Sequence, residues 1–154
     1  MKNERGIKMK RVLCLLLVLC FIPALCNAAT SYDFDTFCGY AYVIGNIEFD
    51  ESNKTVMDGR DIYTTKTGFV GFQYDSNKAK SISVYGNGDE FLVYVFSAIC
   101  TLEESATNIL DNYSTFMWKY FDAHTKGEQY GTTKGGIVFL VKPYEDGYLF
   151  ISDR

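Results

Sequence analysis

Apolar residues in this chain change their spacing at Thr101, and this change limits the folds that the chain can adopt. Upstream they fall in short runs of strand composition; in SISVY (81–85), Ile82 and Val84 alternate with serines. Downstream they recur three or four positions apart, which is the spacing along one face of a helix. These downstream residues are Leu102, Ala106, Ile109, Leu110, Tyr113, Phe116, Met117, Tyr120 and Phe121. The chain therefore has to combine a sheet with a long helix.

The helix is predicted to span residues 102–126. Thr101 and Glu104 form the capping-box pattern, in which a threonine caps the first turn and a glutamate three residues later bonds back to it. Gly127 follows the last predicted helical residue, at a position where glycine commonly ends a helix.

Runs rich in Val, Ile, Tyr and Phe predict the strands of an antiparallel sheet. Two of them, FCGYAYVIGNIEF (37–49) and EFLVYVFSAIC (90–100), are apolar at both alternating positions, so we expect well-covered strands there. IVFLVK (137–142) and YLFIS (148–152) flank the turn PYEDG and predict a C-terminal hairpin. The expected fold class is α+β: a curved antiparallel sheet of about five to seven strands, with the one long helix packed on one face.

The first 28 residues have the pattern of a secretory signal. Basic residues precede an apolar run from Val12 to Ile22, and Cys26-Asn27-Ala28 places small residues where a signal peptidase cuts. The apolar run is about half the roughly 20 residues that a membrane-spanning helix needs. We expect cleavage after Ala28, secretion, and a single globular domain over 29–154. A lipidated cysteine and an uncleaved anchor are the alternatives.

Loss of the leader makes the domain more acidic. It removes five of the 15 basic residues and one of the 19 acidic residues, so the net charge moves from −4 to −8. Nucleic-acid binding needs clustered Lys and Arg, and anionic lipid attracts basic segments. We therefore expect neither a nucleic-acid partner nor stable membrane association after signal cleavage.

Two cysteines, Cys38 and Cys100, follow the leader. In an exported chain they could form one disulfide. Such a bridge would stabilise the fold by roughly 4 kcal/mol in the chain-entropy model. The alternative is two buried thiols that pack as small apolar side chains.

Residues for catalysis or metal binding are scarce. His124 is the only histidine, and a general base needs an orienting carboxylate and a nucleophile beside it. One histidine and two cysteines do not make a zinc site, and no acidic cluster has calcium-loop spacing. The glycine-rich loop GEQYGTTKGG (127–136) follows a helix and precedes a strand, the reverse of a phosphate-binding loop. We expect no catalytic residue, metal or cofactor.

Trp118 is the candidate binding residue. On the predicted helix it lies roughly 60° beyond the edge of the apolar stripe, with Asp111, Ser114 and Asp122 as neighbours. A large rigid aromatic on a polar flank can anchor a protein partner or stack on a sugar ring. The alternative is that loop 127–136 or a sheet edge covers it.

These observations favour an exported, non-enzymatic module that binds a protein or glycan. The alternatives are a carrier with an apolar cavity under the helix, walled by residues such as Phe116, Met117 and Tyr120, and a small secreted hydrolase that uses carboxylates. A filled core with an exposed Trp118 would favour the binding module, and a cavity would favour the carrier.

Overall fold

The computed structural model describes residues 33–49 and 51–154. They belong to one compact unit, Tyr32–Arg154. Residues 1–28, predicted to be a cleaved signal, lie outside the described residues.

A seven-stranded antiparallel sheet forms one layer of this unit, with the strand order β1-β2-β3-β4-β7-β6-β5. Its strands are β1 (Lys54–Met57), β2 (Arg60–Thr64), β3 (Phe69–Asp75), β4 (Lys78–Gly86), β5 (Gln129–Thr132), β6 (Val138–Tyr144) and β7 (Gly147–Asp153). The sheet is not closed. The α+β class, the antiparallel sheet and the C-terminal hairpin β6–β7 are confirmed.

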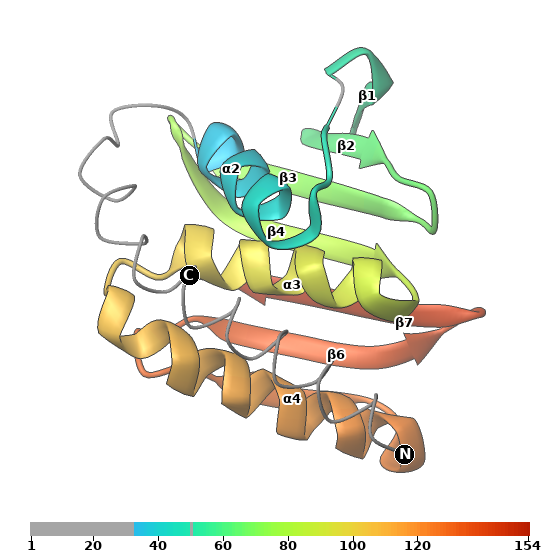
Figure 1. The fold of residues 1–154 in the computed structure, drawn as a ribbon, viewed down its shortest axis with the longest axis vertical. Helices are drawn as coiled ribbons and strands as arrows, with labels where there is room; N and C mark the ends of the chain where they lie inside the picture. The colour runs from blue at the N-terminus through green and yellow to red at the C-terminus, as the bar shows by residue number, and fades with distance from the viewer. Residues whose placement is uncertain (1–32, 50) are drawn as a thin grey trace, which may run out of the picture. The chain divides into compact units, whose positions relative to one another are not determined.

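Three helices cover one face of the sheet (Figure 1). They are α2 (Asp33–Gly45), α3 (Gly88–Leu102) and α4 (Ile109–Lys126), and two short 3-10 turns, η1 (Glu51–Asn53) and η2 (Ala106–Asn108), complete the described elements. The long helix predicted over 102–126 is confirmed as α4. The strands predicted over 37–49 and 90–100 are wrong, because α2 and α3 occupy these segments.

Burial of α3 explains the error at 90–100. Ten of its 15 residues are buried, because α3 lies between α2, α4 and the sheet. A helix covered on most sides has apolar residues all round and loses the one-sided stripe that reveals helical period. A short apolar run cannot then be assigned to helix or strand by periodicity alone.

The boundary between α3 and α4 also differs from the prediction. Thr101 does not cap a helix; it lies in the last turn of α3, where its hydroxyl donates to the Ser97 carbonyl at 2.8 Å. The chain leaves the helix at Glu103, and α4 begins only at Ile109. The capping-box interpretation is therefore wrong.

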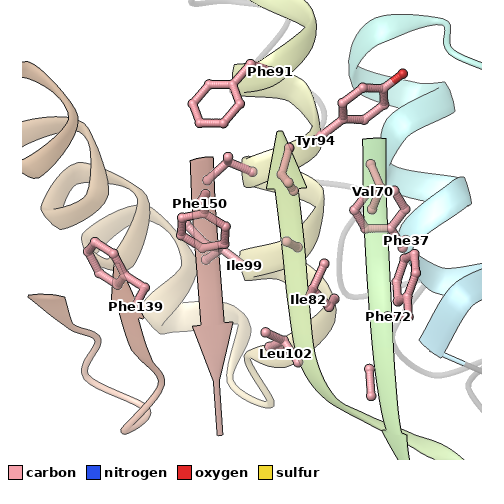
Figure 2. Close-up of a cluster of buried hydrophobic side chains, with 14 of the residues drawn as sticks. Phe37, Val70, Phe72, Ile82, Phe91, Tyr94, Ile99, Leu102, Phe139 and Phe150 are labelled. Carbon is pink, nitrogen blue, oxygen red and sulfur yellow. The ribbon is translucent and has the colours of Figure 1, made fainter. Parts of the chain in front are cut away.

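Aromatic rings fill the core between the helices and the sheet. Phe37 of α2 meets Phe72 of β3 edge-on at 5.1 Å, and Phe139 and Phe150 lie on the neighbouring strands β6 and β7, 5.8 Å apart (Figure 2). Phe116 of α4 packs over this second pair, at 6.1 Å and 5.5 Å. All five are fully buried, so helix packing onto this one sheet face forms the core.

The two halves of the fold have related topologies. In each half a helix precedes a run of antiparallel strands: α2 precedes four, β1–β4, and α4 precedes three, β5–β7. The last strands of the two halves, β4 and β7, pair antiparallel at the middle of the sheet. The sequence shows no corresponding repeat, so the relation exists in the topology alone.

Buried and half-buried tyrosines make the fold sensitive to alkaline pH. Burial raises the pKa of Tyr113 from 10.0 to about 12, and burial is also the largest cause of the raised pKa values of Tyr74 and Tyr94. The folded state therefore holds these protons at a pH where the unfolded chain has released them. This contribution to stability is complete below about pH 10 and is lost as the pH rises toward 12 and above.

We expect urea unfolding curves to show that the free energy of unfolding falls across this pH range as the absorbance of tyrosinate rises. A free energy of unfolding that stays unchanged while the tyrosines ionise would contradict this expectation.

Candidate functional site

Helix α4 has an apolar side that faces the core and a second apolar side that faces solvent. Phe116 is fully buried, whereas Trp118 is 72% exposed, Phe121 is 59% exposed and Leu110 is 48% exposed. At about 100° per residue, these three exposed side chains fall within roughly 80° of one another on the helix circumference. We call Leu110, Trp118 and Phe121 the α4 outer face.

The outer face corrects the predicted stripe at two positions. The sequence places Leu110 and Phe121 in the same buried stripe as Phe116, but the structure exposes both. Helical spacing shows on which side of the helix a residue lies. It does not show how much of the helix circumference the neighbouring elements bury. The outer face is therefore larger and more apolar than Trp118 alone.

Residues 127–136, predicted to be a loop, contain strand β5 at 129–132, and the loop that follows β5 approaches α4 but does not cover Trp118. Lys134 of this loop pairs with Asp111, and Asp122 pairs with Lys126 at 3.1 Å within the helix. These pairs are exposed, so they contribute little to stability. They leave an indole ring flanked by charged side chains and open to solvent.

A buried polar cluster holds the loop against the start of α4. The carboxylate of Glu103 accepts hydrogen bonds from the Asn112 side-chain amide and from the Ser105 backbone N–H, the latter at 3.1 Å. The Asn112 carbonyl oxygen accepts from the Lys134 backbone N–H at 3.0 Å. Glu103 and Asn112 are both buried, and a side chain at Gly135 would collide with the Glu103 carboxylate. Neither residue was predicted from the sequence to have a structural role.

His124 lies exposed near the C-terminal end of α4. Its Nδ1 is 2.6 Å from the hydroxyl of Tyr148 on β7. A tyrosine thus occupies the place next to the ring where a general base would need its orienting carboxylate. The geometry supports a role for His124 in joining α4 to the sheet.

No disulfide joins Cys38 and Cys100 in the described part of the chain. Cys38 lies half-buried on α2, and Cys100 is buried on α3. The two cysteines influence different tyrosines. Cys38 contributes to the raised pKa of Tyr74 on β3, and Cys100 contributes to the raised pKa of Tyr113 on α4. The two sulfur atoms thus lie beside different elements, and the bridge expected from the sequence is not formed here.

Aromatic side chains fill the space under α4, where the carrier alternative expected a cavity. Phe116 contacts Phe139 and Phe150, and Tyr120 packs on Tyr148 at a ring distance of 4.7 Å. An open groove of about 540 Å³ lies elsewhere, beside the N-terminal turn of α2 and strands β1–β3.

Two further observations concern metal sites and membrane-spanning helices. Within residues 33–49 and 51–154, no three His, Cys, Asp or Glu side chains are arranged to hold a metal ion. In the same ranges, no helix is both long and apolar enough to cross a bilayer.

Comparisons with protein-family models, with curated proteins and with solved structures find no match to this chain. Its function is therefore inferred from its own side chains.

Proposed function

We propose that this protein is an exported, non-enzymatic interaction module that binds a protein or glycan through the α4 outer face. The leader pattern of the first 28 residues supports export. The exposure of Trp118 is the single observation that carries the binding role.

The composition of the outer face supports this role. Tryptophan is enriched at the centres of protein interfaces because its ring buries a large area with few rotatable bonds. Its flat face also suits stacking against a sugar ring. Leu110 and Phe121 extend the apolar area around it, and Asp111 and Asp122 supply a polar rim. A grouped apolar patch of this kind marks an interaction site more often than an isolated exposed residue does.

Replacing Trp118 by alanine should remove binding without unfolding the domain. The side chain is largely exposed, so we expect the free energy of unfolding to change by less than about 0.5 kcal/mol. Loss of an interface hot spot weakens binding by about tenfold or more. The measurement is affinity capture from the native extracellular milieu with the mature domain, followed by titration of each captured protein or glycan.

Tyr42→Ala is the matched control, because Tyr42 is an aromatic residue on α2 that is 53% exposed. A partner that Trp118→Ala loses and Tyr42→Ala retains would support the proposal. If every captured partner binds the Trp118→Ala protein as tightly as the unmodified protein, the proposal is wrong.

A further inference from the structure

The open groove beside α2 has a rigid aromatic floor. The rings of Phe34 and Tyr63 stack at 4.4 Å with an interplanar angle of 15°, and both are buried. Phe72 meets Tyr63 edge-on at 5.8 Å and stacks with Tyr74 at 6.0 Å. Because α2, β2 and β3 each supply part of this cluster, the floor is fixed by the core and needs little rearrangement to receive a ligand.

The groove walls carry an excess of negative charge. Its lining includes Asp35, Asp61 and Lys54, and Lys54 pairs with Asp61 at 3.5 Å. Nearby Asp33 pairs with Arg154 at 3.0 Å and accepts the Ala79 backbone N–H. Among the described residues, no cationic side chain lies within ion-pair distance of Asp35. One exposed carboxylate at the groove, in the first turn of α2, therefore has no ion-pair partner among the described side chains.

The hydroxyl of Tyr74 adds a hydrogen-bonding group to this wall. Burial raises the pKa of Tyr74, and the neighbouring Tyr63, Asp61 and Asp33 raise it further. The phenol therefore stays neutral at pH 7, and its oxygen can accept a hydrogen bond from an ammonium group.

We infer that this groove binds a small organic cation, an amine with an apolar body, whose ammonium group pairs with Asp35 while the body lies against the aromatic floor. The volume of about 540 Å³ is within the range of small-molecule sites. A sugar fits less well, because it carries no positive charge to pair with Asp35. This site is separate from the α4 outer face and independent of its function.

Phenethylamine is a suitable probe, with 2-phenylethanol and phenylacetate as its neutral and anionic counterparts and methyl glucoside as a sugar. Two-dimensional NMR titration of the mature domain, at probe concentrations up to about 10 mM, reports both position and affinity. We expect phenethylamine to shift the signals of Tyr63 and Tyr74 and to bind at least about fivefold more tightly than 2-phenylethanol. Equal binding of amine and alcohol, amine shifts located elsewhere, methyl glucoside binding at these signals, or no binding of the amine would overturn the inference.

Two substitutions with opposite expected effects sharpen this test. Asp35→Asn keeps the shape of an exposed side chain and should abolish the preference for amine over alcohol. Lys54→Gln removes the partner of Asp61 and should tighten amine binding by about threefold, because the groove becomes more negative. Asp89→Asn removes an exposed carboxylate on α3 and should change nothing, as should Trp118→Ala. Unchanged amine binding in both Asp35→Asn and Lys54→Gln would contradict the site.

Discussion

Phe116→Ala is expected to lower the free energy of unfolding by about 3–5 kcal/mol, the largest loss from any substitution considered for this domain. Phe116 is fully buried, and its ring lies within 6.5 Å of five other aromatic rings. Those rings belong to Phe91, Tyr113, Tyr120, Phe139 and Phe150. Because α3, α4, β6 and β7 all meet there, the cavity left by alanine cannot close by movement of one element alone. Urea unfolding, followed by circular dichroism, measures the loss.

Phe121→Ala makes the same chemical change on the same helix and serves as the control. Phe121 is 59% exposed, so its removal should cost less than about 1 kcal/mol. The contrast between the two substitutions tests the orientation of α4 directly. Comparable losses from Phe116→Ala and Phe121→Ala would mean that α4 is rotated from the position described here.

Asn112→Ala is expected to lower the free energy of unfolding by about 2–3 kcal/mol. The amide of Asn112 donates to the Glu103 carboxylate, and its carbonyl oxygen accepts from the Lys134 backbone N–H. Alanine would leave a buried charged acceptor and a backbone donor without this partner. Since Lys134 lies in the loop between β5 and β6, the same change should also increase hydrogen exchange in that loop. Thermal or urea unfolding gives the first effect, and amide exchange gives the second.

Asn87→Ala is a matched control for this prediction. Asn87 is exposed and precedes α3, but its side chain makes no capping hydrogen bond. Its replacement should change the free energy of unfolding by less than about 0.5 kcal/mol. If Asn112→Ala lowers the free energy of unfolding no more than Asn87→Ala does, the buried cluster around Glu103 does not stabilise the fold.

Much of the fold class was predictable from the sequence because two regular patterns are intact. SISVY alternates along β4, with Ile82 and Val84 facing the core and serines on the other side. The apolar stripe after residue 102 correctly predicted a helix there, because α4 lies at the margin of the helical layer and has one polar side. The segments of α2 and α3 lack this asymmetry, and both were taken for strands.

The site was predictable only in part, for a related reason. Trp118 was identified because its neighbours at helical spacing are polar. In the folded domain Trp118 is exposed on that side of α4. Leu110 and Phe121 were misplaced because their exposure depends on how far α3 and the sheet extend around α4. Asn112 lies among polar neighbours such as Asp111 and Ser114, so nothing in the sequence marked it as buried. The groove near Asp35 carried no sequence signal, since its lining comes from α2, three strands and a turn that are distant in sequence.

The central claim, that the exposed side of α4 is the binding surface, can be tested through the fluorescence of Trp118. It is the only tryptophan in the chain, so all indole emission reports on this one position. The free domain should show the long-wavelength emission of a solvated indole and strong quenching by acrylamide. Addition of a captured partner should shift the emission to shorter wavelength and reduce quenching, with both changes saturating together with binding. Saturable binding that leaves the emission and quenching of Trp118 unchanged would contradict the claim.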